Sequence, residues 1–305
     1  MIFKPKSEQQ ALPGIKPIKK QERKEHRGEG RKAIIVLFIV TVLASVLFYL
    51  QAEAPKIWEK ITAPKVISRL PKGHFNPDQT IIQLKELTQD LSGTYGIYVY
   101  RFKDGYNYGL NQEKVFPAAS LNKLPVMIAA YQQAEEGKVN LETKYTLKEE
   151  DKVQGAGLLQ SELAGSQYTY RQLIEYMAQH SDNTAFKIMR QVTKEEIIEK
   201  ITPEEVGLLF KRLYEGELIN QENTDELLQF LTETDFEDRL PQGVPENIRV
   251  AHKIGTLTGV YSDAGIIFAE PPFVLVIMTE DARESEALEV LPQITQIVWD
   301  FETAL

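Results

Sequence analysis

The sequence contains no cysteine, and this absence removes several kinds of chemistry at once. Without a thiol the chain can form no disulfide, no thiolate metal site, no cysteine nucleophile and no lipidated N-terminal cysteine. The redox compartment stays open, because a cysteine-free domain folds in oxidising and in reducing surroundings. A covalent mechanism in this chain therefore cannot use sulfur.

Histidine is also scarce, with four residues in 305. Four scattered histidines are too few for a metal site, so we expect neither a metal nor another cofactor. His180 and His252 both lie beside motifs that are described below. A lone histidine is more often a structural hydrogen-bonding residue than a catalytic one, and we interpret both in that way.

Positive charge is concentrated at the N-terminus. Residues 1–32 hold ten Lys or Arg and four Glu, a net charge of +6, so a chain of net charge -9 carries -15 in its remainder. An acidic body argues against nucleic acid as a partner. The first 32 residues are polar, contain proline and have no helical or strand period, so we predict a disordered basic tail.

Residues 33–50 form one long uncharged run, eighteen residues that read AIIVLFIVTVLASVLFYL. This length is just enough to cross the ~30 Å hydrocarbon core as a helix. A cleaved signal peptide is the alternative, but its basic leader would be unusually long and Pro55 follows the only A-x-A site. We predict an uncleaved single-pass anchor in the cell membrane, with the tail in the cytoplasm and the body extracytoplasmic.

Residues 51–77 contain several prolines and lysines and are predicted to be a juxtamembrane linker, and residues 78–305 are predicted to be one domain. In this domain two strand-like runs come early, helical patterns follow, and three strand-like runs and a terminal helix come last. The late runs are 249–255, 260–268 and 273–278. The order predicts an α+β fold, an antiparallel sheet flanked by helices.

Ser120 and Lys123 are three residues apart at the start of an apolar helical run, and Ser120 is the only serine with a lysine three residues on. Such a pair shares one helix face, and a serine near a helix N-terminus lies where backbone N–H groups favour negative charge. The pair is the minimum for a nucleophilic serine whose proton passes to a lysine. Further along the chain come Ser181-Asp182-Asn183, between two helices, and Lys253-Ile254-Gly255, on a strand.

In this order the three motifs resemble the S-x-x-K, S-D-N and K-T-G set of class A β-lactamases and penicillin-binding proteins. The resemblance spans roughly residues 78–305 and includes the segments 155–159 and 239–256. It implies a serine hydrolase that transfers an acyl group from a β-lactam or a related amide to a serine. We expect a monomer whose partners are a small β-lactam or a cell-wall peptide.

The resemblance assigns a role to each site residue, in a catalytic set and a substrate-binding set. Lys123 must be neutral to act as a base, so its pKa must fall well below about 10.4, and we expect the like charge of Lys253 to lower it. Asp182 is expected to brace its loop. The catalytic set is Ser120 as nucleophile, Lys123 as base and Ser181 as proton relay; the substrate-binding set is Asn183, Lys253, Gly255 and Thr256, and the N–H groups of Ser120 and Thr256 would form the oxyanion hole.

Two departures from the family pattern concern deacylation and the binding of the substrate carboxylate. Family members carry a long loop with a Glu-x-x-Leu-Asn segment whose glutamate positions the deacylating water, whereas here residues 183–200 run directly into Thr202-Pro203. We therefore predict that this omega-type loop is deleted. Glu195, Glu196 and Glu199 are possible substitutes, but their spacing with two isoleucines predicts a solvated helix face instead. In addition, Ile254 replaces the threonine of K-T-G.

Acylation is thus supported by the motifs, while deacylation lacks an evident base. Three functions stay open: a membrane-anchored class A β-lactamase-like hydrolase with slow deacylation, a D,D-carboxypeptidase or penicillin-binding protein acting on peptidoglycan peptides, and a catalytically poor module that binds the cell wall. The intact set of motif residues favours the first two. The missing loop and Ile254 favour the third.

Overall fold

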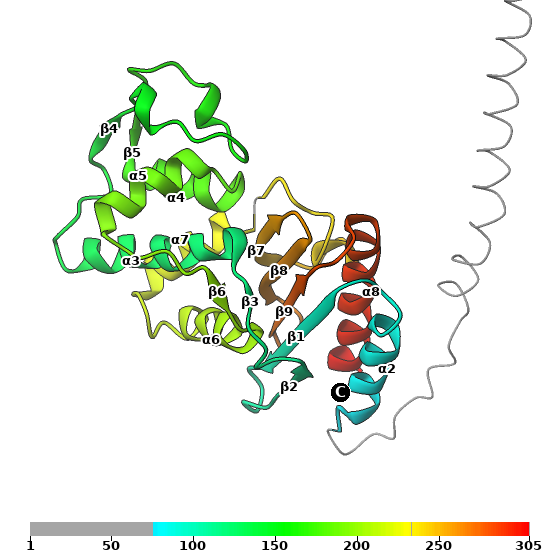
Figure 1. Ribbon diagram of the computed structural model, residues 1–305. Coiled ribbons are helices and arrows are strands. Elements are labelled where there is room, and N and C mark those ends of the chain that lie inside the picture. Colours follow the sequence, from blue (N-terminus) through cyan, green and yellow to red (C-terminus); the bar gives the residue numbers. More distant parts are fainter. Residues whose placement is uncertain (1–75, 233, 305) are drawn as a thin grey trace, which may run out of the picture. The chain divides into compact units, whose positions relative to one another are not determined.

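The computed structural model describes residues 76–232 and 234–304, which Figure 1 shows in colour. The predicted basic tail, the predicted anchor at 33–50 and all but the last two residues of the predicted linker lie outside the described residues. Within the described ranges no helix has both the length and the apolar composition needed to cross a membrane.

A five-stranded antiparallel sheet organises the fold, in the order β2-β1-β9-β8-β7. β9 is central, and it pairs with β1 from Thr94↔Glu280 to Arg101↔Phe273. All but the last of its residues are buried, because both faces of the sheet are covered. The strands are β1 (Thr94–Arg101), β2 (Asn107–Leu110), β7 (Val250–Leu257), β8 (Val260–Ile267) and β9 (Phe273–Glu280).

Each face of the sheet has its own apolar cluster, since successive side chains of a strand point to opposite faces. Ile97 and Ile277 pack with Leu291 in the cluster beneath α2 (Asp78–Thr88) and α8 (Glu284–Thr303). Tyr98 and Val276, one residue away, belong to the cluster that faces the helical region. Figure 1 shows α2 and α8 side by side on one side of the sheet and the other helices on the opposite side. The predicted α+β fold, an antiparallel sheet flanked by helices, is confirmed.

The helical region is built around α3 (Lys123–Glu135), whose residues from Lys123 to Tyr131 are buried apart from Pro125. α4 (Tyr170–Gln179) and α6 (Pro203–Tyr214) both begin with a capping box, and at the start of α6 Thr202 accepts from the N–H of Glu205. The remaining elements of this region are η1 (Ala119–Asn122), β4 (Lys144–Thr146), η2 (Glu149–Asp151), η3 (Leu159–Ser161), β5 (Gln167–Thr169), α5 (Asn183–Thr193) and α7 (Gln221–Phe230), and η4 (Pro241–Gly243) precedes the last three strands.

The predicted helix face formed by Glu195, Glu196 and Glu199 is wrong. α5 ends at Thr193, because Lys194 adopts the left-handed conformation with φ 59°, and residues 194–199 form no helix. The chain then forms β6 (Lys200–Ile201), which pairs with β3 (Phe116–Pro117). The N–H of Ala118 donates to the carbonyl of Glu199 at 2.9 Å, so this short connection passes directly beside the start of the Ser120 segment.

Candidate active site

Ser120 and Lys123 lie where a short 3₁₀ turn, η1, passes into α3. Pro125 has no N–H to donate, which suits the first turn of an α-helix, and the α-helix accordingly begins only at Lys123. The residue before the nucleophile candidate, Ala119, has a φ of 46°, a conformation that costs a residue with a side chain about 1 to 3 kcal/mol. The surrounding packing therefore holds Ser120 in a strained turn.

The amine of Lys123 joins two of the predicted motifs. Its Nζ donates to Ser120 Oγ at 2.7 Å and to Asn183 Oδ1 at 2.9 Å. The side chain is almost wholly buried, with 2% of the residue exposed. Burial lowers the pKa of Lys123 to about 8, against a smaller raising effect of the Asp182 carboxylate. The low pKa expected from the sequence is confirmed, but its cause is burial and not the charge of Lys253.

A second lysine–serine pair, Lys253 and Ser181, joins the last motif to the second one. Lys253 Nζ donates to Ser181 Oγ at 2.9 Å, and both residues are buried. Burial lowers the pKa of Lys253 well below its ordinary value, and the nearby Lys123 lowers it further. Ser181 has a φ of 51°, a second strained conformation in this site. Two lysines of depressed pKa and two serines thus meet in one place.

Asp182 holds the loop that carries Ser181 and Asn183. It is fully buried, caps α5 by accepting from the N–H of Ala185 at 2.9 Å, and accepts from the N–H of Leu159 at 2.8 Å. Gly157, with φ 105°, packs so closely that a Cβ there would lie 2.3 Å from Asp182 Cγ. The bracing role expected for Asp182 is confirmed, and the bracing partner is the segment 155–159.

β7 brings the last motif against the nucleophile turn. A Cβ on Gly255 would lie 3.2 Å from Ala118 O and 3.3 Å from the Ala119 side chain. Glycine therefore allows the strand to approach the turn that carries Ser120. Ile254 is buried and pairs with Asp263 on β8.

Arg239 contacts the end of the last motif, although the sequence analysis gave it no role in the site. It is buried, donates through Nη2 to Thr256 Oγ1 at 2.7 Å, and donates through Nη1 to the carbonyl of Ser262 at 2.6 Å. The segment 239–256 contributes to the family resemblance, but no local spacing reveals that a loop arginine folds back onto the strand end. Thr256 thus has a cationic neighbour from another segment.

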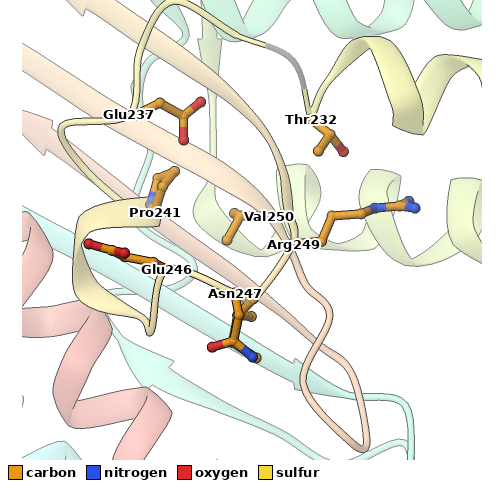
Figure 2. A pocket seen from close by; sticks show the side chains of 8 residues that line it. Thr232, Glu237, Pro241, Glu246, Asn247, Arg249 and Val250 are labelled. Carbon is orange, nitrogen blue, oxygen red and sulfur yellow. The ribbon is translucent and has the colours of Figure 1, made fainter.

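A cavity of about 280 Å³ lies elsewhere, at the start of β7 (Figure 2). None of the predicted site residues lines it. Its lining includes Glu237, Glu246 and Arg249, and it is open to solvent. The chemistry of the motifs therefore belongs to the two lysine–serine pairs and not to this cavity.

The two histidines beside the motifs both bind carboxylates. His180 Nδ1 lies 2.7 Å from Asp235 Oδ2, and His252 Nδ1 lies 2.9 Å from Asp263 Oδ1. Both are hydrogen-bonding residues, as expected. Among residues 76–232 and 234–304, no three His, Asp or Glu side chains gather in a way that could hold a metal ion.

Comparison with known proteins identifies the family. The model of the β-lactamase enzyme family matches residues 80–301, which is most of the chain. The chain belongs to this family. A curated relative, the β-lactamase VEB-1 of Pseudomonas aeruginosa, is 20% identical over 270 residues that cover 73% of this chain and 90% of the relative.

Several solved structures, a β-lactamase among them, share the fold. PBP-A is 25% identical and superimposes with a TM-score of 0.69 over 77% of this chain and 100% of its own. A leucine-to-glutamate mutant of PBP-A, solved as an acyl-enzyme complex with penicillin G, is 23% identical with a TM-score of 0.70 over 77% and 100% of the two chains. A β-lactamase from Sphaerobacter thermophilus is 23% identical and has a TM-score of 0.70, over 76% of this chain and 99% of its own. The chain therefore has the β-lactamase-like fold of these structures, in agreement with the family that its sequence matches.

Proposed function

We propose that this protein is a class A β-lactamase-like hydrolase that is acylated at Ser120 by β-lactams or related amides and deacylates slowly. The observation that carries the proposal is the buried Lys123 amine, 2.7 Å from Ser120 Oγ. A pKa of about 8 leaves about a tenth of this amine neutral at pH 7, and the neutral amine can accept the serine proton. A solvated lysine on a helix would have almost no neutral form.

Acylation follows from this pair and its neighbours. Lys123 Nζ takes the hydroxyl proton as Ser120 Oγ bonds to the carbonyl carbon, and the N–H groups of Ser120 and Thr256 stabilise the oxyanion. The carbon–nitrogen bond then breaks, and Ser181 passes a proton to the leaving nitrogen. Ser181 recovers a proton through its hydrogen bond to Lys253. Asn183, already bonded to Lys123, holds the substrate amide.

The substrate carboxylate binds at the end of β7. Lys253 is driven toward its neutral form in the empty site, and an incoming carboxylate favours the ammonium form. Gly255 lets the strand lie close to the acyl group, and Thr256 offers its hydroxyl. Arg239, bonded to that hydroxyl, supports binding of negative charge where Ile254 supplies no hydroxyl.

Slow deacylation is proposed from the connection between α5 and β6, which consists of the six residues 194–199. We interpret this connection as a deletion of the omega-type loop that holds the water-positioning glutamate. Among residues 76–232 and 234–304, no side-chain hydrogen bond involves the carboxylates of Glu195, Glu196 or Glu199. This short connection also favours the second candidate, a D,D-carboxypeptidase or penicillin-binding protein acting on peptidoglycan peptides. A catalytically poor module that binds the cell wall remains the third.

The remaining assignments rest on the sequence. We propose that residues 33–50 anchor the chain in the cell membrane, that residues 1–32 lie in the cytoplasm, and that residues 78–305 form a monomeric extracytoplasmic domain. The charge of the first 32 residues and the uncharged run that follows support this orientation.

Intact-protein mass spectrometry of the full chain in detergent, mixed with penicillin G and followed over time, tests the proposal. We expect an adduct that persists for hours in the wild type and is absent in Ser120→Ala. Ser285→Ala, which changes an exposed serine at the start of α8, is the matched control and should retain the adduct. An adduct that is lost within seconds would contradict slow deacylation. If the folded wild type forms no adduct, both enzyme candidates are excluded and only the module that binds the cell wall remains.

A further inference from the structure

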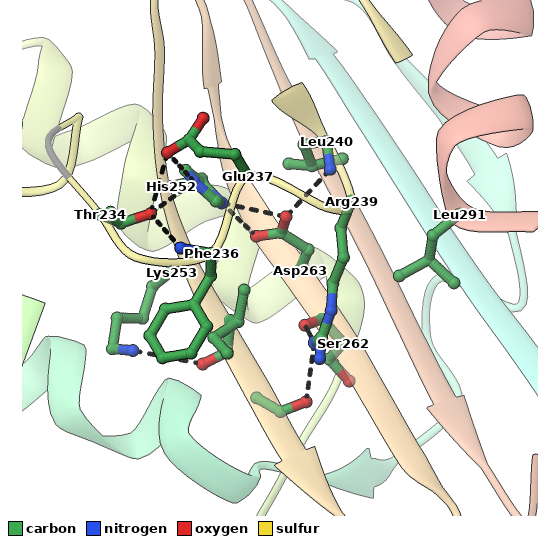
Figure 3. A network of polar contacts seen from close by, with 12 residues as sticks. Thr234, Phe236, Glu237, Arg239, Leu240, His252, Lys253, Ser262, Asp263 and Leu291 are labelled. Carbon is green, nitrogen blue, oxygen red and sulfur yellow. Dashed lines mark hydrogen bonds and ion pairs between the residues drawn. The ribbon is translucent and has the colours of Figure 1, made fainter. Parts of the chain in front are cut away.

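Residues 234–240, here named the edge loop, wrap around the outermost strand of the sheet. Near its beginning Phe236 lies against Lys253, with Nζ 5.9 Å from the ring centroid. At its end the side chain of Leu240 is buried in the cluster beneath α8. The edge loop therefore passes from the face of β7 that carries the candidate active site to the opposite face, as Figure 3 shows.

His252 and Asp263 form an ion pair inside this wrap. Both side chains are fully buried, and His252 Nδ1 lies 2.9 and 3.0 Å from the two carboxylate oxygens. Burial alone would lower the pKa of His252, but the charge and hydrogen bond of Asp263, aided by Glu237, raise it to about 9. The imidazole is therefore a cation at neutral pH, and both ring nitrogens donate.

The ion pair fastens both ends of the edge loop. His252 Nε2 lies 3.1 Å from Thr234 Oγ1, and Thr234 Oγ1 in turn accepts from the N–H of Phe236 at 3.2 Å. At the other end the N–H of Leu240 donates to Asp263 Oδ2 at 3.1 Å. One buried pair thus fixes where the loop begins and where it finishes.

The pair cannot itself touch a substrate at the lysine–serine site. Alternation along β7 places His252 with Val250, which packs in the cluster beneath α8, and Lys253 with Ala251, which packs in the cluster facing the helices. Any effect of the pair on the reaction must therefore pass through the edge loop. That loop carries Arg239, which is bonded to Thr256, and Phe236, which contacts Lys253.

We propose that the His252–Asp263 pair is a positioning element that holds the edge loop, and through Arg239 and Phe236 fixes the end of the site that binds the substrate carboxylate. This inference rests on the proposed function. The other charged groups near the pair are Glu237 on the edge loop and Lys253, which lies on the other face of β7 but within the electrostatic influence of Asp263. Glu237 Oε1 lies 3.8 Å from His252 Nε2, too far for a hydrogen bond.

The test compares Asp263→Asn with the control Glu237→Gln in the full chain, because both remove one carboxylate near His252 and only the first removes the carboxylate that is hydrogen-bonded to His252. Acylation by penicillin G is compared with acylation by its methyl ester, which lacks the carboxylate. We expect Asp263→Asn to lower the second-order rate constant for acylation by penicillin G by about tenfold to hundredfold, because the concentration needed for half of the maximal acylation rate rises. The rate constant for the ester should change less than about twofold. Glu237→Gln should leave both rates within about twofold.

Hydrogen exchange provides a readout that needs no substrate. We expect residues 234–240 to exchange faster in Asp263→Asn while α3 and β9 keep their protection. Equal losses for the acid and the ester, or unchanged exchange in the edge loop, would overturn the inference. If the wild type forms no adduct the proposed function fails, and the exchange result still decides the positioning role. If Asp263→Asn does not fold, Thr234→Val takes its place with the same expectations; it removes the hydrogen bonds of Thr234 Oγ1 to His252, to the N–H of Phe236 and to Glu237, and leaves the His252–Asp263 pair in place.

Discussion

A lysine buried among apolar side chains loses the hydration of its ammonium group, and at Lys123 this loss creates the proposed base. The protein gains a neutral amine near neutral pH, and it also destabilises its own fold. The pKa of Lys123 is about 8 when folded and 10.5 when unfolded, so between these values the unfolded chain binds more protons. The contribution of this group to stability therefore rises as the pH rises from about 8 to 10.5, and its penalty is complete below pH 8.

The same pKa sets a pH dependence for acylation. We expect the rate constant for acylation of the wild type by penicillin G to rise with pH, with an inflection near pH 8 and a plateau above it, because only neutral Lys123 accepts the Ser120 proton. Stopped-flow measurement from pH 6 to 9.5 checks this. Lys200→Gln, which removes an exposed lysine on β6, should keep the inflection. A rate that is independent of pH over this range would rule out Lys123 as the titrating base.

At the scale of elements, close backbone approach decides where the second motif lies. The segment 155–159 packs directly on the Ser181-Asp182-Asn183 loop, and the N–H of Asn183 donates to the carbonyl of Ala156 at 3.0 Å. Gly157 makes this approach possible because it has no side chain and adopts a positive φ. The position of Asn183, and through it of Lys123, therefore depends on a glycine outside all three motifs.

Gly157→Ala and Gly165→Ala separate close approach from backbone strain. Both glycines have a positive φ, 105° and 98°, but a Cβ meets Asp182 at 2.3 Å in the first case and nothing within 4 Å in the second. We expect Gly157→Ala to lower the free energy of unfolding by about 2 to 4 kcal/mol and to slow acylation. Gly165→Ala should lower the free energy of unfolding by about 1 kcal/mol and leave the acylation rate unchanged. Denaturant titration and adduct kinetics measure both, and equal effects of the two changes would contradict the argument.

The sequence predicts an element well where its signals are local. The three late strand-like runs were predicted from near neighbours in the chain, and β7, β8 and β9 confirm them. The segment 194–199 was predicted incorrectly, because it leads into β6, and the pairing of β6 with β3, some eighty positions earlier in the chain, overrides helical spacing. Arg239 and the His252–Asp263 pair were missed for the same reason, because contacts between a loop and a strand elsewhere in the chain produce no periodic pattern of residues in the sequence.

At the scale of the whole molecule, the candidate site lies where the helical region meets β7, the edge of the sheet (Figure 1). An edge strand has one free side, and here Leu231, at the end of α7, occupies part of it by accepting from the N–H of His252 at 2.8 Å. The buried His252–Asp263 pair joins β7, β8 and the edge loop. Its charge state should therefore influence global stability.

The sign of this influence follows from the pKa of His252. That pKa is raised from 6.5 in the unfolded chain to about 9 in the folded chain, so the pair's contribution is complete below pH 6.5 and is lost as the pH rises through 9. A shift of this size in a fully buried group corresponds to about 3 kcal/mol. The contribution of Lys123 has the opposite sign, but it is the same in two proteins that differ only at Asp263 and cancels in their difference.

We therefore expect the loss of unfolding free energy caused by Asp263→Asn to be largest near pH 6 and to shrink by about 3 kcal/mol as the pH rises to 9.5. Denaturant titrations of both proteins at several pH values measure this difference. Asp235→Asn, in the more exposed His180–Asp235 pair, should cost less than about 1 kcal/mol at every pH. A loss for Asp263→Asn that stays constant from pH 6 to 9.5 would mean that His252 is neutral in the folded protein, and that the edge loop is held by neutral hydrogen bonds rather than by an ion pair.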